Sequence, residues 1–147
     1  MNVKTILAAK SQNLGGDIVS IEPTADLGAA ARLLAAHRIG ALVIRGAGDR
    51  LAGIISERDI VRTLAERGAD ALSVPVGQVM TREVETCGAD DNVASLMERM
   101  TTGKFRHLPV MEQGRLIGLV SIGDVVKQRV EEFEREQEAL RDYIRTA

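Results

Sequence analysis

The sequence predicts a mixed α/β fold made of two pseudo-symmetric repeats, followed by a C-terminal helix. The stretch "RLAGIISERDIV" at residues 50–61 matches "RLIGLVSIGDVV" at 115–126, and residues 18–44 align over 83–110 at an offset of 65 to 66. A fixed offset of this kind indicates a duplicated structural unit. Within each copy the apolar spacing alternates between that of strands and that of helices, which favours the order strand, helix, strand, strand, helix.

The first repeat begins with a short strand at residues 19–21, which Pro23 ends. Apolar residues of 27–34 then recur at helical spacing. Two strands, at 41–45 and 51–55, flank a turn rich in Gly and Asp, and a second helix is expected after Ser56.

The second repeat follows the same order. We expect a strand at residues 84–86, a helix over 93–100, strands at 107–111 and 115–120, and a helix after Ser121. A three-stranded sheet in a unit of about 55 residues is marginally stable alone. The two repeats are therefore expected to pack sheet to sheet in one globule.

The domain boundaries follow from the repeat. We assign residues 1–72 to the first repeat with its lead-in, 73–130 to the second, and 131–147 to an amphipathic helical extension. The tail carries a heptad stripe with one polar break at Gln137, and its apolar members are Val126, Val130, Phe133, Leu140 and Ile144. Two interpretations stay open, namely a solvated helix folded back on its own module and a helix seam with a second subunit.

Composition excludes several classes of function. A net charge of −2 and 2% aromatic residues offer neither counterion release nor stacking platforms, so nucleic-acid binding is not expected. No apolar run reaches the length of a membrane span, and the N-terminal "MNVKTILAAK" is too interrupted for a signal peptide. The single cysteine, Cys87, fits a reducing compartment. These features predict a cytoplasmic protein.

No catalytic or metal-binding constellation is readable. The chain has one cysteine and two scattered histidines, which gives no metal-ligand spacing. No nucleophile has a base partner at a readable spacing, and no Walker loop occurs. We therefore expect no catalytic activity and no metal.

A Ser-x-x-Asp unit begins the last helix of each repeat: Ser56 with Asp59, and Ser121 with Asp124. One interpretation is a capping box, in which the serine and the acid satisfy unpaired N–H groups of the helix. The other is a ligand site, because a helix N-terminus suits a phosphate and a nearby carboxylate can accept both hydroxyls of a ribose. The residues alone leave both open.

The two halves differ just before their middle strands. The second repeat has Arg106 and His107 where the first has Gly40 and Ala41. Arginine is a forked, permanently charged phosphate ligand, and histidine can donate hydrogen bonds beside it. The alternative is a strand end with solvated charges.

The duplicated unit resembles the CBS domain pair, or Bateman module, of the stand-alone type. The resemblance covers roughly residues 3 to 130 and is carried by "HRIGALVI", "LAGIISERDIV", "VGQVMT", "FRHLPVM" and "RLIGLVSIGDVV". It implies a regulatory module without catalysis of its own, which binds an adenine nucleotide in the cleft between its repeats and signals to a partner. The rival interpretation is a structural protein–protein interaction module whose ligand sites have decayed.

The resemblance also implies roles for particular residues. Asp59 and Asp124 are expected to hold the ribose. The other expected contacts are Ser56, Arg58, Arg106, His107 and Ser121 for phosphate, and Ile18, Val19, Val84 and Cys87 for adenine. AMP is the first ligand we expect, and NAD(H), ADP and ATP fit the same contacts. Because CBS pairs commonly dimerise as flat discs, we expect a homodimer to which the tail contributes, and a regulated protein of unknown identity.

Overall fold

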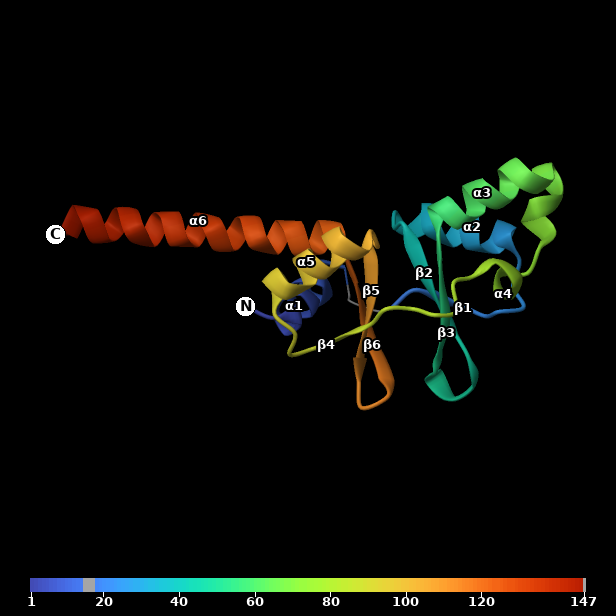
Figure 1. Cartoon of the computed structure of the whole chain (residues 1–147), viewed down its shortest axis with the longest axis horizontal. Coiled ribbons are helices and arrows are strands. Elements are labelled where there is room, and N and C mark those ends of the chain that lie inside the picture. The colour runs from blue at the N-terminus through green and yellow to red at the C-terminus, as the bar shows by residue number, and fades with distance from the viewer. Residues whose placement is uncertain (15–17, 147) are drawn as a thin grey trace. The chain divides into compact units, whose positions relative to one another are not determined.

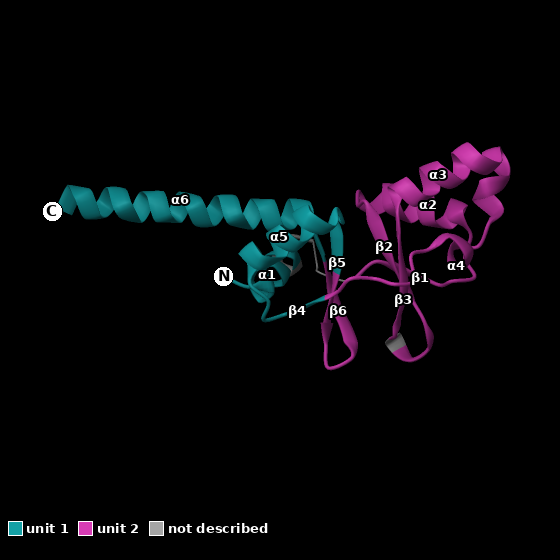
Figure 2. Cartoon of the chain, in the orientation of Figure 1, with its two compact units in different colours: residues 1–16, 87–108, 120–147 teal, residues 17–86, 109–119 magenta. Residues whose placement is uncertain are grey.

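The computed structural model describes residues 1–14 and 18–146. The elements are labelled in Figure 1, and Figure 2 shows that the chain divides into two compact units. Unit 1 comprises residues 1–16, 87–108 and 120–147, and unit 2 comprises 17–86 and 109–119. Each unit is described by itself below.

Unit 2 contains most of the first repeat. Its elements are β1 (Ser20–Ile21), α2 (Leu27–His37), β2 (Ala41–Arg45), η1 (Ala47–Asp49), β3 (Leu51–Ser56), α3 (Glu57–Arg67), η2 (Gly68–Ser73) and α4 (Val76–Val79). The strands form a sheet in the order β1-β2-β3, with β1 parallel and β3 antiparallel to β2. Leu42 lies opposite Ile55 in this register. The predicted order of strands and helices is confirmed.

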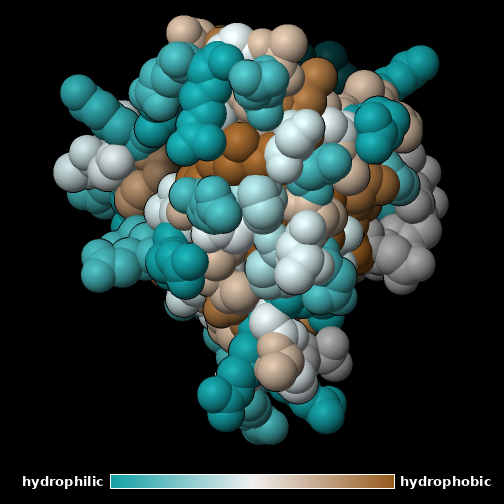
Figure 3. All heavy atoms as spheres, turned by 90° about the vertical axis from the view of Figure 1, so that its right-hand side faces the viewer, coloured by the Kyte–Doolittle hydropathy of each residue, from teal (hydrophilic) through white to brown (hydrophobic). Residues whose placement is uncertain are grey.

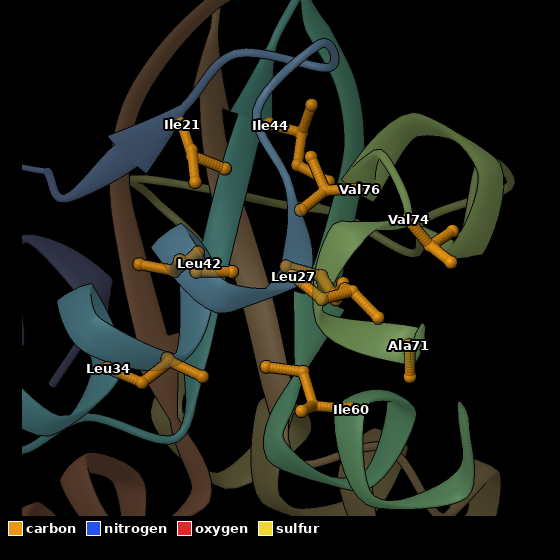
Figure 4. Packing of buried hydrophobic residues seen from close by; sticks show 11 residues of the cluster. Ile21, Leu27, Leu34, Leu42, Ile44, Ile60, Ala71, Val74 and Val76 are labelled. Atoms are coloured by element: carbon orange, nitrogen blue, oxygen red, sulfur yellow. The ribbon is translucent and has the colours of Figure 1, made fainter. Parts of the chain in front are cut away.

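The core of unit 2 lies between this sheet and α2, α3 and η2 (Figure 4). Asp26 caps α2 by accepting a hydrogen bond from the Ala29 N–H at 2.8 Å, and Arg38 ends it in the left-handed conformation with φ 55°. The buried face of α2 carries Leu27, Ala30 and Leu34. The buried cluster comprises Ile21, Leu27, Ala30, Leu34, Leu42, Ile44, Ile55, Ile60, Ala71, Val74 and Val76.

The surface at the α3 end of unit 2 is mixed. Figure 3 shows hydrophilic side chains over most of this face, with hydrophobic residues between them. On α3, Val61 is 64% exposed and Leu64 is 36% exposed. Scattered exposed apolar residues of this kind are normal for folded proteins.

Unit 1 is built mainly from the second repeat and both chain ends. Its elements are α1 (Val3–Leu14), β4 (Cys87–Gly88), α5 (Val93–Gly103), the start of β5 (His107–Glu112), the end of β6 (Arg115–Ser121) and α6 (Ile122–Thr146). The second sheet has the order β4-β5-β6. Asn92 caps α5 by accepting from the Ala94 N–H at 2.8 Å, and Lys104 ends it with φ 58°. Lys104 lies 66 residues after Arg38, so the two helices end alike.

The lead-in segments dock in equivalent ways. In unit 2 the Val76 N–H donates to the Ala25 carbonyl at 2.8 Å, and in unit 1 the Val3 N–H donates to the Asp91 carbonyl at 3.0 Å. The sequence assigns residues 1–72, lead-in included, to the first repeat. The structure groups α1 in unit 1 with α5 and α6, because each lead-in satisfies its backbone beside the N-terminus of a helix of the other repeat.

Two other features differ from the sequence analysis. The strand expected at 84–86 is found at β4 (Cys87–Gly88), where Cys87 is buried whereas Val84 is only half-buried. The tail is continuous with the last helix of the repeat as the 25-residue α6. Every residue from Phe133 to Thr146 is exposed, so the tail does not fold back. Among the described residues, no helix combines the length and apolarity that crossing a membrane requires.

We predict that Gly53→Ala destabilises the fold. Its Cβ would lie 2.6 Å from the Thr81 carbonyl oxygen, and Thr81 pairs with Ile54 through N–H···O bonds of 2.9 and 3.0 Å. Because backbone must move, we expect a loss of about 1–3 kcal/mol in the free energy of unfolding, measured by urea denaturation.

The matched control is Gly46→Ala, whose nearest neighbour would be the Ala52 Cβ at an ordinary 3.5 Å. We expect this variant to stay within about 0.5 kcal/mol of the parent protein. Equal stability of the two variants would contradict the close packing of β3 against Thr81.

Candidate functional site

The mouth of α3 forms where β3 ends at Ser56. The Ser56 N–H donates to Asp59 Oδ2 at 2.9 Å, and the Asp59 N–H donates to Ser56 Oγ at 3.4 Å. This is the reciprocal arrangement of a capping box. Asp59 Oδ1 also accepts from the Arg62 guanidinium at 3.1 Å, and the Asp59 side chain is 12% exposed. The capping interpretation of this unit is confirmed, and it leaves a ligand role untested.

The mouth of α6 repeats the arrangement. The Ser121 N–H donates to Asp124 Oδ2 at 2.9 Å, and the Asp124 N–H donates to Ser121 Oγ at 3.1 Å. The Asp124 side chain is 25% exposed, about twice the value for Asp59. The carboxylate that caps α6 is therefore more accessible to solvent than its counterpart on α3.

A backbone hydrogen bond ties each mouth to the residue that precedes the middle strand. The Glu57 N–H donates to the Gly40 carbonyl at 3.0 Å, and the Ile122 N–H donates to the Arg106 carbonyl at 2.8 Å. Gly40 and Arg106 are thus structural equivalents, as the repeat predicts. The exposed Arg106 side chain begins beside the first turn of α6, and the half-buried His107 follows as the first residue of β5. The structure brings Arg106, Ser121 and Asp124 to the same helix end.

Lys10 is a charged neighbour of this mouth that the sequence analysis missed. Its Nζ lies 3.0 Å from Asp124 Oδ2, and the two side chains are 37% and 25% exposed. The sequence feature that pointed to this segment is the similarity between the lead-ins "VKTIL" and "VGQVM", because it marks both segments as equivalent parts of the repeat. The lead-in helix α4 stops at Val79 whereas α1 continues to Leu14, and that extra length carries Lys10 to Asp124.

The remaining predicted contacts are distributed over both units. Arg58 is exposed on the first turn of α3. Ile18, Val19 and Val84 are half-buried in unit 2, and Cys87 is buried in unit 1. Their expected role in holding adenine remains a prediction. Within the part of the chain that the structure describes, no cluster of His, Cys, Asp or Glu could hold a metal ion.

Comparison with known families decides the classification. The family model for the CBS domain matches the chain twice, at residues 15–66 and 76–131. The chain belongs to the CBS domain family. The predicted family and the two-repeat α/β fold with a C-terminal helix are therefore confirmed. CBS domain pairs are regulatory modules.

Solved CBS structures support the same fold. A CBS-domain-containing protein from Agrobacterium tumefaciens is 45% identical, with a TM-score of 0.81 over 88% of this chain and 99% of that one. A CBS domain protein from Pyrobaculum aerophilum, complexed with AMP, is 28% identical, with a TM-score of 0.72 over 84% and 89%. A CBS domain pair in complex with 5-methylthioadenosine and S-adenosyl-L-methionine is 25% identical, with a TM-score of 0.77 over 90% and 98%.

Curated relatives are longer than the matched region. The mitochondrial CBS domain-containing protein CBSX3 of Arabidopsis thaliana is 40% identical over 78% of this CBS chain. The matched region covers 58% of the length of that relative. A second alignment covers 64% of a 17.7 kDa protein from Acidianus ambivalens.

The buried thiol of Cys87 has a raised pKa, which gives a testable prediction about its reactivity. Burial raises the pKa of its thiol from 9.0 to about 11, and the negative charge of Asp91 adds to the effect. At pH 8 we therefore expect the folded protein to react with Ellman's reagent about 100-fold more slowly than the urea-unfolded chain, because the thiolate is the nucleophile.

The raised pKa also sets a direction for stability. The folded state keeps the thiol proton to higher pH than the unfolded state does. The contribution of Cys87 to the free energy of unfolding is therefore complete below pH 9 and is lost as the pH rises towards about 11. Cys87→Ser should lack this dependence in pH-resolved melting curves. A native thiol that reacts as fast as the unfolded one would contradict the burial.

Proposed function

We propose that this chain is a regulatory sensor of adenine nucleotides that signals ligand occupancy to a partner protein. The observation that carries the proposal is the mouth of α6. There a capping carboxylate, a serine, the end of a long helix and Arg106 meet. The AMP and S-adenosyl-L-methionine complexes of the related CBS proteins support an adenosine-type ligand.

Capping the helix and binding a ribose are compatible roles for Asp124. An ionised carboxylate has about four lone-pair positions. The Ser121 N–H and the Lys10 ammonium use Oδ2. The remaining positions can accept the 2′ and 3′ hydroxyls, and the capping bond holds the carboxylate in one orientation for them. We propose the same role for Asp59, whose Oδ1 must first exchange Arg62 for the ribose.

The charges around α6 suit a phosphate. The helix end contributes partial positive charge, and Arg106 adds a full charge that the equivalent Gly40 cannot. We therefore propose Ser121, Arg106 and His107 as the phosphate contacts of the tighter site. Ser56 and Arg58 serve the site at α3. We propose AMP as the first ligand, with NAD(H), ADP and ATP as the others to test.

The adenine contacts and the signalling complete the proposal. Ile18, Val19, Val84 and Cys87 would provide aliphatic contacts for the base, since aromatic residues are scarce. Ligand can shift the chain between states only by its difference in affinity for them, and the regulated protein reads that shift. We also propose that the protein is a homodimer, that it has no catalytic activity of its own, and that it acts in the cytoplasm.

A second candidate function is a structural interaction module in which both Ser-x-x-Asp units act only as caps. The two complete capping arrangements favour it, because they satisfy the helix ends without any ligand. Ligand binding distinguishes the two functions.

The first test is thermal stability with nucleotides. A ligand that binds only the folded protein stabilises it by about 2.7 kcal/mol at 100 times its Kd. We expect AMP to raise the melting temperature, with S-adenosylmethionine, ADP, ATP and NAD(H) ranked beside it. Unchanged melting at millimolar concentrations of all these ligands would favour the interaction module.

The second test separates ribose from phosphate contacts at α6. Asp124→Asn keeps a capping side chain but loses the charge, and we expect about tenfold weaker binding of both AMP and adenosine. Arg106→Ala should weaken AMP about tenfold and leave adenosine unchanged. Calorimetric titration measures both affinities.

The control is Arg115→Ala, because Arg115 is an exposed arginine at the start of β6. Arg115→Ala should bind AMP like the parent protein. If Arg106→Ala weakens adenosine as much as AMP, Arg106 is not a phosphate contact.

A further inference from the structure

The exposed part of α6 carries an apolar seam that one polar residue, Gln137, interrupts. Within unit 1 the helix extends well beyond α1 and α5 (Figure 2). Its apolar residues lie at alternating steps of four and three, which is the spacing of a coiled-coil seam. The exposed fractions are 39% for Val126, 50% for Val130, 60% for Phe133, 55% for Leu140 and 65% for Ile144.

The seam faces away from the rest of unit 1. The side of α6 that is buried carries Val125 and Gln128. At 3.6 residues per turn, Val126 and Val130 each lie about 160° around the helix from Gln128. The packing of α6 on its own unit therefore leaves the seam uncovered along its whole length.

We propose that this seam pairs with the same seam of a second copy in a parallel, in-register, two-stranded coiled coil. The inference gives the homodimer of the proposed function a defined interface. It does not depend on nucleotide binding.

The charges beside the seam favour the parallel arrangement. Val126, Phe133 and Leu140 take the d positions, and the g and e positions next to them carry charge except for Tyr143. In a parallel pair each g residue faces the e residue five positions further along the partner. Arg129 then faces Glu134 of the partner subunit, and Glu136 faces Arg141 of the partner subunit. Both pairs are attractive and both occur twice in the dimer.

Antiparallel pairing lacks this complementarity. Full overlap of the seams sets Glu136 against its own counterpart and Lys127 against Arg141 of the partner subunit, so like charges meet. A slide of one heptad towards the N-terminus separates these charges but leaves Leu140 and Ile144 without partners in the seam.

Gln137 adds a second reason for the parallel register. It occupies an a position and is the one polar residue in the seam. In the parallel, in-register pair the two Gln137 side chains face each other and can hydrogen-bond. In the full antiparallel overlap each faces Phe133 of the partner subunit and loses its partner. A single polar a residue of this kind specifies register at some cost in stability.

The intrahelical ion pair of Arg129 does not oppose the proposal. Arg129 lies 2.7 Å from Glu132 Oε2 on the same helix, and its side chain is 44% exposed. An exposed pair of this kind contributes little stability, so the guanidinium can contact Glu134 of the partner subunit in addition or instead.

Disulfide trapping in the full-length chain tests the orientation. Ile144→Cys places a thiol at the far end of the seam, and the parallel pair brings the two copies within the about 7 Å that a disulfide allows between Cα atoms. In the full antiparallel overlap the same two positions are roughly 27 Å apart. We expect Ile144→Cys to form an oxidised dimer at micromolar concentration, without nucleotide present.

The matched control is Asp142→Cys, two residues away on the outer side of the same exposed helix. We expect about tenfold slower cross-linking, because only the seam position gains the effective concentration of the paired helices. The parent chain, with its buried Cys87, serves as the blank. Equal cross-linking of the two variants would overturn the proposal. So would a mixture of Val126→Cys and Ile144→Cys chains in which each variant forms its disulfide preferentially with the other variant rather than with itself.

Two further variants test the forces involved, with sedimentation equilibrium as the measurement. In the Ile144→Cys background, Leu140→Asp should weaken association and slow cross-linking about a hundredfold, because it buries an unpaired carboxylate. Glu136→Arg and Arg141→Glu should each weaken the dimer about two- to fivefold, and the double variant should restore it. Folding is checked by melting temperature, which should not change much at these exposed positions. Failure of the double variant to restore association would contradict the parallel charge pairing.

Discussion

A helix that starts where a buried strand ends needs acceptors for its first N–H groups, and the rest of this structure depends on how the chain supplies them. At α3 and at α6 the same three acceptors serve: a serine hydroxyl, a carboxylate three residues later, and the carbonyl that precedes the middle strand. This solution fixes a carboxylate at each helix mouth. It also holds the backbone of Gly40 at the mouth of α3 and that of Arg106 at the mouth of α6, so the side chain at this position lies beside the helix end.

Duplication explains why two similar mouths can differ in chemistry. The backbone hydrogen bonds recur 65 to 66 residues apart, whereas the side chains of the residues that make them differ. Glycine stands at one mouth and arginine at the other, and the longer lead-in α1 adds Lys10 only beside Asp124. Arg106 and Lys10 at the α6 mouth arise from this substitution and this longer helix on a shared backbone frame. The proposed specialisation of the α6 mouth for phosphate would require no change in the fold.

The helix that carries Asp124 in its first turn ends as an extended, highly charged surface with an apolar seam. The N-terminal turns of α6 are held by packing through Val125 and Gln128. Beyond Glu132 no described residue of the helix is buried. Most helical stability in proteins comes from packing an amphipathic face, so a second copy would stabilise this segment. Because one helix carries both the mouth and the seam, the proposed assembly and the proposed ligand binding would share one element.

The sequence by itself determined the repeat, the order of strands and helices, the Ser-x-x-Asp caps and the heptad spacing of the tail. All of these are local patterns, set by periodicity and by the needs of a helix end. Tertiary structure alone decided that α1 packs with α5 and α6, that Lys10 reaches Asp124, and that the tail is one helix with α6. It also moved the expected strand from 84–86 to Cys87–Gly88. Contacts between residues more than a hundred positions apart depend on where the chain returns in space, and no local pattern encodes that.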